Sequence, residues 1–340
     1  MDNFPFVSLV VLNYNGGHIL PEFFAALEKL AYPEDKLETI FVDDGSTDDS
    51  VYFVRENYPD VKVIRNDKNI GPAESRNKGI KETRGKFIAF LDNDCFVTPQ
   101  WLAQLVKAMQ ADPDIGIAAS KLLFEDRRDT INSAGGIINR YADAYDRGVY
   151  ERDSGQFEKD ERVFYGCSAA MLIRSSVIGR TGLFDVDYFY LYEDVDFGWR
   201  VNLAGYKVVY VHSAVAYHKL SHTMGRGSLK IKYFLERNRL LTVLKNYGLA
   251  ALLKYGFAFA RERPKKFLKY KTQGRLDNVG LFWMGLRAWL WNFVNIAATC
   301  RKRRQVQRVI RKLQDSEIWD IIYRLNFTQA GSIYENSNRS

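Results

Sequence analysis

Two clusters of acidic residues carry the clearest chemical signal in this chain of 340 residues. Residues 92–94 read DND and follow the apolar run FIAFL, and residues 191–200 read LYEDVDFGWR and hold the acids Glu193, Asp194 and Asp196. Acids also favour the start of any helix, because they interact well with its dipole. Two acidic clusters, each at the exit of an apolar element, nevertheless predict a metal site and a general base that face one substrate.

The first cluster has the spacing of a metal site. Asp92 and Asp94 can turn to one side where the chain leaves extended geometry, and there they could hold a hard divalent ion that bridges a diphosphate. A plain strand-to-helix turn is the alternative, because Asp and Asn are common in turns. His218 follows a strand-like segment and would by itself be a structural histidine. Beside two carboxylates, however, its neutral imidazole would complete the coordination.

Alternating strand and helix signals must position these residues over the first 110 positions. Short apolar runs predict strands at 7–12, 37–42, 61–64 and 87–91, and helix-compatible stretches lie near 18–30, 47–57, 72–84 and 98–110. We expect N-terminal caps at Ser46-Thr47-Asp48 and Thr98-Pro99. This order predicts an α/β fold whose mostly parallel sheet is covered by helices on both faces.

Polar residues at the ends of these strands are candidate ligands of a substrate, because such sheets bind ligands beyond the C-terminal ends of their strands. They include Asn13, Asn15, Asp43 and Asp44. An Asp here could accept the imide N–H of uracil or thymine, or could cap a helix. The chain has no G-x-G-x-x-G dinucleotide fingerprint, and the near match to a phosphate-binding loop at 79–86 has the wrong spacing.

The rest of the chain divides at about residue 228. Strands are expected at 115–124, 164–173 and 206–211, and the polar segment 125–162 is expected to shape an acceptor site. Residues 229–312 hold 21 Lys and Arg against 3 Asp and Glu, a net charge of +18, so the remainder carries 28 − 38 = −10. We therefore predict a catalytic domain at 1–228 and a basic, aromatic-rich helical region at 229–340, which needs an anionic partner.

The stretch from Val279 to Cys300 has one charge and can be interpreted in three ways. Its length would permit a span, but the basic flanks on both sides, at 265–275 and 301–304, oppose one. A buried or dimer-interface helix is the second reading. An in-plane amphipathic helix with tryptophans at headgroup level fits best. The three scattered cysteines predict no disulfide framework, and the N-terminus is no signal peptide, so we expect a reducing compartment.

Five motifs occur in a specific order along the chain: NYNG, VDDGSTDDS, NIGPAESRNKGI, FLDND and GLFDVDYFYLYEDVDFGWR, followed by a histidine. Over roughly residues 6–240 this order resembles the family 2 glycosyltransferases with the GT-A fold, in particular the rhamnosyltransferase-like branch that builds bacterial surface polysaccharides. The Q-x-x-R-W signature of processive members is absent from this sequence, which favours one or a few additions. The region from 241 onward matches no motif of the family.

The resemblance implies a role for each matching residue. Asn13 and Asn15 would border the nucleoside, and Asp43 or Asp44 would read the base. Asp92 would contact the ribose or a metal-bound water, Asp94 and His218 would ligate Mg²⁺ or Mn²⁺, and Asp194, beside Glu193, would be the catalytic base. Further substrate contacts are expected from the donor-pocket segment and from two arginines: Asn69, Arg76, Asn77, Arg200 and Arg237.

The sequence therefore predicts an inverting, metal-dependent glycosyltransferase. Its donor would be a dTDP- or UDP-sugar, with rhamnose as one candidate, and its acceptor a glycan or a polyprenyl-linked sugar. We expect it in the cytoplasm, at the inner face of the cytoplasmic membrane, with a homodimer as an alternative use of its helices. Two other readings remain: a sugar-phosphate nucleotidyltransferase, which lacks its basic loop here, and a non-catalytic scaffold docking on membrane or, less favoured, nucleic acid.

Overall fold

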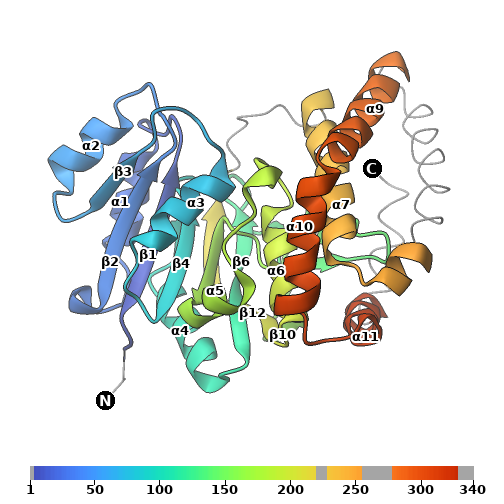
Figure 1. The fold of residues 1–340 in the computed structure, drawn as a ribbon. Coiled ribbons are helices and arrows are strands. Elements are labelled where there is room, and N and C mark those ends of the chain that lie inside the picture. The colour runs from blue at the N-terminus through green and yellow to red at the C-terminus, as the bar shows by residue number, and fades with distance from the viewer. Residues whose placement is uncertain (1–3, 220–227, 255–277, 328–340) are drawn as a thin grey trace. The chain divides into compact units, whose positions relative to one another are not determined.

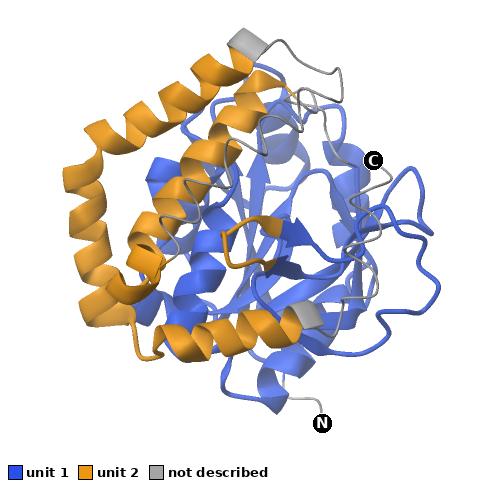
Figure 2. Ribbon diagram, turned by 90° about the vertical axis from the view of Figure 1, so that its right-hand side faces the viewer, with its two compact units in different colours: residues 1–137, 145–221 blue, residues 138–144, 222–340 orange. Residues whose placement is uncertain are grey.

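The computed structural model describes residues 4–219, 228–254 and 278–327 (Figure 1). The chain divides into two compact units, coloured separately in Figure 2. Unit 1 comprises residues 1–137 and 145–221, and unit 2 comprises residues 138–144 and 222–340. The short segment 138–144 thus belongs with the helical part, which the sequence did not suggest. The boundary near residue 228 stays a prediction.

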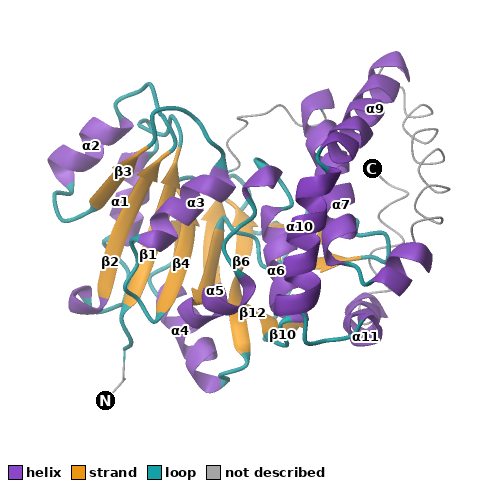
Figure 3. Cartoon of the chain, viewed as in Figure 1, coloured by secondary structure: helices purple, strands orange, loops and turns teal. Residues whose placement is uncertain are grey.

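Unit 1 is built on one large sheet, with strand order β10-β12-β6-β11-β4-β1-β2-β3 (Figure 3). Beside this path, β5 pairs with β12 and β7 with β6, and β8 and β9 form a separate two-stranded ladder. The strands are β1 (Val7–Asn13), β2 (Leu37–Asp43), β3 (Lys62–Arg65), β4 (Phe87–Asp92), β5 (Cys95–Val97), β6 (Ile115–Phe124), β7 (Ile131–Ser133), β8 (Gly136–Ile138), β9 (Ala144–Asp146), β10 (Glu161–Val163), β11 (Ala170–Arg174) and β12 (Lys207–His218).

The predicted fold class is confirmed. β1 pairs in parallel with β2 and β4, β2 with β3, and β12 with β6. The strand expected at 164–173 begins only at Ala170, and this strand, β11, runs antiparallel between β4 and β6. Since β11 is antiparallel to both β4 and β6, and β12 is parallel to β6, the strands β4 and β12 run in the same direction. Their carboxyl ends therefore lie at the same edge of the sheet.

Helices cover both faces of the sheet, as expected. Along β1 alternate side chains enter different cores, because successive residues of a strand point to opposite faces: Leu9 packs with Phe23 and Trp101, and Val10 packs with Phe197. The first core receives α1 (Leu20–Leu27), α2 (Ser50–Asn57) and α4 (Trp101–Ala111), and the second receives α3 (Pro72–Lys81), α5 (Ser175–Thr181) and α6 (Glu193–Leu203). Short 3₁₀ turns lie at η1 (Glu34–Lys36) and η2 (Val186–Tyr188).

The first predicted cap is confirmed in part, because the Asp48 carboxylate accepts from the backbone N–H of Ser50, the first residue of α2, at 3.1 Å, whereas Thr98 does not cap α4. The N-cap residue of α2 is Asp49 and that of α4 is Gln100, and neither caps with its side chain. The hydroxyl of Ser46 instead donates to Asp43, and the hydroxyl of Thr98 donates to the carbonyl of Val215 at 3.0 Å. The bond from Thr98 is long-range and reaches β12, which a local sequence pattern does not reveal, whereas the bond from Ser46 stays within its own turn.

Unit 2 is helical, in agreement with the basic helical region expected there. Its helices are α7 (Leu229–Asn246), α9 (Asn278–Val294), α10 (Ile296–Gln305) and α11 (Asp315–Phe327), with a π-helical turn η3 (Val306–Ile310). The apolar stretch expected as one helix is interrupted at Asn295, the N-cap residue of α10. Among the residues described, no helix is long and apolar enough to cross a bilayer. The basic flank at 265–275 lies outside them.

Candidate functional site

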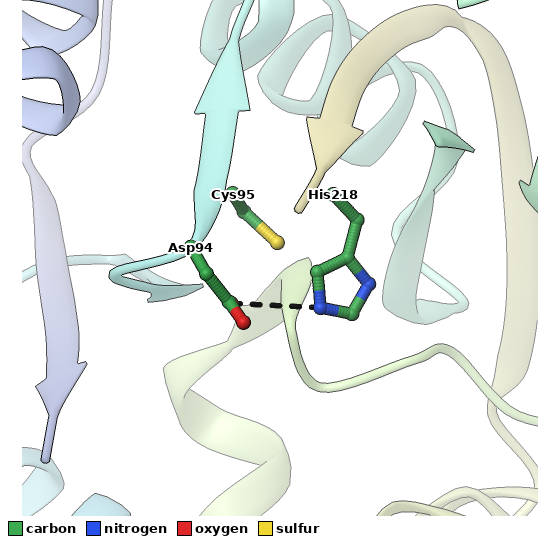
Figure 4. A group of neighbouring side chains, drawn as sticks. All are labelled: Asp94, Cys95 and His218. Atoms are coloured by element: carbon green, nitrogen blue, oxygen red, sulfur yellow. Dashed lines mark ion pairs between the residues drawn. The ribbon is translucent and has the colours of Figure 1, made fainter. Parts of the chain in front are cut away.

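The ladder between β5 and β12 brings Asp94 and His218 together. Its antiparallel register sets Cys95 opposite His218, so that Asp94, one residue earlier, meets the imidazole. Asp94 Oδ1 lies 3.5 Å from His218 Nε2 (Figure 4), and the backbone carbonyl of Asp94 accepts from the N–H of Lys219. The ligand atoms of Asp94, Cys95 and His218 all lie within 4.8 Å of one another. Two residues more than 120 positions apart thus form one cluster.

The donor set of this cluster fits a divalent ion held by oxygen and nitrogen. A carboxylate and an imidazole suit Mg²⁺, Mn²⁺ and similar ions. Burial by itself lowers the pKa of His218. The hydrogen bond and the charge of Asp94 outweigh burial and raise this pKa above its ordinary value, which shows that the surroundings of the imidazole are negatively charged. Burial raises the pKa of the Cys95 thiol strongly, so Cys95 stays protonated and is a weak ligand.

A residue that the sequence did not reveal orients the imidazole. Asn132, in the short strand β7, has its Oδ1 3.0 Å from Nδ1 of His218. If Nδ1 carries the proton and donates to Asn132, then Nε2 presents its lone pair to the side of Asp94. Hydrogen bonds of this kind fix the tautomer of metal-binding histidines. No sequence motif marks Asn132, because it acts only through β7 and its pairing with β6.

Arg76 links the two acidic clusters. Its guanidinium, in α3, donates to Asp92 Oδ1 at 2.7 Å and to Glu193 Oε1 at 3.2 Å, and its side chain is only 2% exposed. A buried arginine with two carboxylates is held in a single position by its planar, forked donors. The two clusters predicted to face one substrate are therefore in contact through one side chain. Burial raises the pKa of Asp92, although Arg76 opposes the rise.

The turn into α6 is strained in a way that directs its acids. Phe189, Leu191 and Tyr192 have φ angles of 55°, 66° and 71°, in the left-handed region that favours glycine. Each such residue costs about 1–3 kcal/mol, and clusters of them occur mainly at functional sites. Tyr192 is the N-cap residue of α6, so Glu193 and Asp194 occupy its first turn. From this turn Glu193 accepts from Arg76 at 3.2 Å, and Asp194 accepts from the backbone N–H of Ser168 at 3.4 Å.

Both acids of this pair have a raised pKa. Burial, followed by the charge of Asp194, raises the pKa of Glu193 to about 7. Burial, followed by the charge of Asp146, raises the pKa of Asp194 to about 6. The expected neighbour, Asp196, is instead neutralised by Arg200, whose Nε donates to it at 2.9 Å. A carboxylate with a pKa near 6 is a far better proton acceptor than an ordinary Asp.

Asp146 is a second participant that the sequence did not reveal. It lies at the end of β9 and accepts a hydrogen bond from Ser133 Oγ at 2.9 Å. Burial raises the pKa of Asp146, while hydrogen bonds from Ser133 and Tyr165 and the charge of His218 oppose the rise. Its place in the polar segment 125–162 agrees with the expectation that this segment borders the site.

The loops after β1 and β2 form a network around Ser46. Asn13 donates through Nδ2 to Asp43 at 2.8 Å and to Ser46 at 3.1 Å, and its Oδ1 accepts from Asn93 at 2.5 Å. Asn15 has a φ of 52°, and its backbone N–H donates to Ser46 Oγ at 2.8 Å. These five polar residues therefore build one hydrogen-bonded rim at the ends of adjacent parallel strands.

Asp44 holds the loop that leads into α3. Its carboxylate accepts from Asn66 Nδ2 at 3.0 Å and from the backbone N–H groups of Ile70 and Gly71 at 2.9 and 3.0 Å. Asn69, in the same loop, has an exposed side chain. Asp43 and Asp44 are both almost fully buried. Both carboxylates already accept several hydrogen bonds from within the chain. This leaves them limited capacity to bind a nucleobase.

The model of the family described as glycosyl transferase family 2 matches residues 8–181, just over half of the chain. The chain belongs to this family. The match covers the strands β1 to β4, Arg76 and the acids at 92–94. Asp194 and His218 lie beyond it, so their assignment depends on their geometry around Arg76 and Asp94.

Curated relatives are glycosyltransferases as well. Glycosyltransferase AglE of Haloferax volcanii is 25% identical over 74% of this chain and 81% of its own. The N-acetylglucosaminyl-diphospho-decaprenol L-rhamnosyltransferase of Mycobacterium tuberculosis is 28% identical over 64% of this chain and 77% of its own. Several others match over 24% to 40% of their own length. These names agree with a glycosyltransferase, but the rhamnosyl branch is not established.

A solved structure supports the GT-A architecture. GalNAc-T7 with UDP, GalNAc and Mn²⁺ superposes with a TM-score of 0.61 and 18% identity over 78% of this chain. This chain spans about half the length of that one, 51%. At this identity the likeness concerns the fold alone. The sequence-based expectation of a GT-A sheet is confirmed, and activity must be argued from the residues.

Two residues predicted to contact the substrate, Asn77 and Arg200, have partners within the chain. Both atoms of the Asn77 amide bind the main chain of Phe184, at 2.8 and 2.9 Å, so this side chain clamps α3 to a loop. Arg200 is 4% exposed and donates to Asp196 and to the carbonyl of Thr181. These bonds give Arg200 a structural task within unit 1, and its predicted contact with a substrate stays a prediction.

Arg237 belongs to unit 2. Its guanidinium lies over the ring of Trp291 at 4.4 Å and over that of Phe234 at 4.9 Å, and its Nε donates to Asn238. Such cation–π contacts are worth up to about 2 kcal/mol when desolvated. Through these contacts Arg237 holds α7 and α9 together within unit 2. Its predicted contact with the donor diphosphate stays a prediction.

Proposed function

We propose that this family 2 glycosyltransferase moves a sugar from a nucleoside diphosphate to an acceptor hydroxyl, with inversion at the anomeric carbon. One observation carries the proposal: a carboxylate with a pKa of about 6, Asp194, lies in one unit with a carboxylate–imidazole pair suited to a divalent ion. Arg76 joins the two groups through Asp92 and Glu193. A proton acceptor and a site for a leaving diphosphate are what this reaction requires.

Asp94 and His218 would hold a divalent ion, with Asp92 beside them. When bound, Mg²⁺ or Mn²⁺ would offset the charge of the departing nucleoside diphosphate. The GT-A relative named above was solved with UDP and Mn²⁺, which supports the choice of ion class. Arg76 keeps Asp92 oriented toward this side, because its second hydrogen bond to Glu193 fixes the guanidinium.

Asp194 would act as the general base. Its carboxylate removes the proton of the acceptor hydroxyl while the hydroxyl oxygen bonds to the anomeric carbon. The bond from that carbon to the diphosphate oxygen breaks, and the diphosphate leaves with the electron pair. General base work contributes about 10²–10⁴-fold to a rate. Burial and the charge of Asp146 hold the pKa of Asp194 at about 6, which keeps it a stronger base than an ordinary Asp.

The nucleoside would lie along the rim formed by Asn13, Asn15, Asp43 and Asp44, with Asn69 at the mouth of the following loop. Asp43 or Asp44 would accept the imide N–H of uracil or thymine. We propose a UDP- or dTDP-linked donor, and rhamnose as the first sugar to try, because one curated relative is a rhamnosyltransferase.

We further propose a glycan or polyprenyl-linked acceptor, used in the assembly of a surface polysaccharide. The name of the same relative includes a diphospho-decaprenol acceptor. An acceptor of that kind is confined to a bilayer, so the chain would work at the inner face of the cytoplasmic membrane, associated peripherally. The positive charge of residues 229–312 supports contact with an anionic surface.

A donor panel tests this proposal. The purified chain would be given dTDP-, UDP- and GDP-sugars with Mn²⁺, with Mg²⁺ or with a chelator, and release of nucleoside diphosphate would be followed with and without a lipid-linked acceptor. We expect metal-dependent release from one uridine or thymidine donor. If the folded protein neither binds nor turns over any donor, the transferase proposal fails and a non-catalytic role takes its place.

A further inference from the structure

Helix α9 in unit 2 carries its apolar side chains on the outside. Phe293 and Val294 are 75% and 71% exposed, and Phe282 is 64% exposed. We call the exposed apolar side of this helix the outer face of α9; it comprises Phe282, Trp283, Leu286, Trp289, Leu290 and Phe293. Large exposed apolar patches mark contact sites with another molecule or with a membrane.

The opposite side of the same helix is turned inward although it carries an amide. Asn292 is 2% exposed, and its Nδ2 donates to the carbonyl of Arg237 in α7 at 3.0 Å. Leu281, Met284 and Ala288 are buried beside it. A helix that faces water has the reverse arrangement, with its polar side outward. The bond from Asn292 to α7 anchors α9 in the orientation that exposes the aromatic and leucine side chains.

Positive charge follows α9 directly along the chain. Residues 278–314 contain eight Lys and Arg and no Asp or Glu. Arg303 and Arg311 turn inward and donate to backbone carbonyls of Leu244, Tyr247 and Asn246. Arg301, Arg304 and Arg308, which follow α9 in α10 and η3 (Figure 1), have exposed side chains. Exposed apolar side chains in α9 and exposed arginines in α10 and η3 therefore occur in consecutive elements.

We propose that the outer face of α9 lies in the plane of an anionic lipid bilayer, with Arg301, Arg304 and Arg308 binding headgroup phosphates. Tryptophans favour the headgroup level, because their rings are apolar and their N–H groups are polar. The proposal deepens the membrane association proposed above and names its surface. It can fail while sugar transfer stands, since lipid binding is measured without any donor.

A second copy of the chain is a poorer occupant of this face. A symmetric contact would bring two segments with eight cations and no acid each against one another, and like charges repel. An anionic bilayer supplies the opposite sign and an apolar layer at once. Each arginine near such a surface adds about 1 kcal/mol, which is about fivefold in binding.

Vesicle co-sedimentation of the full chain tests the proposal. Vesicles of phosphatidylcholine alone would be compared with vesicles that also contain phosphatidylglycerol. We expect binding to the mixed vesicles, and a loss of roughly tenfold or more when Leu286, Leu290 and Phe293 are changed together to Glu. Changing Arg301, Arg304 and Arg308 together to Gln should cost about a hundredfold on the mixed vesicles.

The matched control places the same charge change elsewhere: Tyr52→Glu, Asn57→Glu and Ala111→Glu, three exposed uncharged residues of α2 and α4 in unit 1. This variant should bind vesicles as the wild type does. Circular dichroism and donor turnover with a water-soluble acceptor would show that every variant is folded. Equal binding by the α9 variant overturns the proposal. So does a wild-type dimer that ignores vesicles and becomes monomeric in the α9 variant, which would assign the face to a second copy.

Discussion

Among single residues, Asp194 has the most direct consequence for pH dependence. Because the proposed base must be ionised and its pKa is about 6, the rate of sugar transfer should fall as the pH drops below about 6. Asp146→Asn removes a neighbouring negative charge and should move this acidic limb to lower pH. A profile of kcat/KM against pH checks both. An acidic limb that stays in place in Asp146→Asn would contradict the link between the two carboxylates.

The same raised pKa predicts a cost in stability. The folded protein holds the proton of Asp194 up to about pH 6, whereas the unfolded chain releases it near 3.8, so this residue makes the fold less stable as the pH rises through that window. Asp194→Asn should therefore raise the free energy of unfolding by about 1–3 kcal/mol at pH 8 and hardly at pH 4. Urea unfolding with a chelator present measures this, with Asp67→Asn, in an exposed loop, as the control.

Asn132 offers a third test at this scale, independent of turnover. Asn132→Leu removes the acceptor of the His218 Nδ1 proton, so affinity for Mn²⁺ should fall by about 10–100-fold. Asn132→Asp retains an acceptor and should bind Mn²⁺ at least as well as wild type. Titration calorimetry gives the affinity, and ¹⁵N NMR of the imidazole gives the tautomer. Thr130→Val, just before β7, is the control. An unchanged tautomer in Asn132→Leu would rule out the orienting role.

At the scale of elements, the position of α6 depends on two close packing contacts. Tyr165 fits between Gly136, next to β9, and Gly198 in α6: a Cβ at Gly136 would lie 2.2 Å from the ring, and one at Gly198 would lie 2.6 Å from the Tyr165 Cβ. Neither gap can be opened by moving a flexible side-chain end. These contacts hold the helix that carries Asp194 against the ladder that carries Asp146.

Gly198→Ala should consequently destabilise the fold by about 1–3 kcal/mol and reduce turnover, since overpacking shifts the backbone. Gly179→Ala is the matched control: it too is helical, in α5, and an added Cβ would meet nothing within 4 Å. That change should be neutral or stabilise by up to about 1 kcal/mol. Chemical unfolding of the two variants decides the matter, and equal stability would refute the packing account.

For the whole molecule, the sequence predicted the parallel half of the sheet well, and two of the residues it singled out, Asp94 and His218, lie together. Strong apolar runs and short loops define β1 to β4, and the polar residues at their ends follow from strand direction. Sequence patterns could not reveal Asn132 or Asp146, because both reach the site through the short strands β7 and β9. Nor did they reveal that Arg200 pairs with Asp196 one helical turn earlier, since such an ion pair has the same sequence pattern as an exposed charge.

The central claim concerns the whole catalytic unit: a sugar is transferred with Asp194 as the base. The most direct measurement compares the transfer rate of wild type and Asp194→Asn on one donor, with donor affinity determined alongside. Removal of the base should lower the rate by about 10²–10⁴-fold while donor affinity stays within a few fold. A variant that keeps wild-type turnover, with the donor bound equally well, would contradict this account.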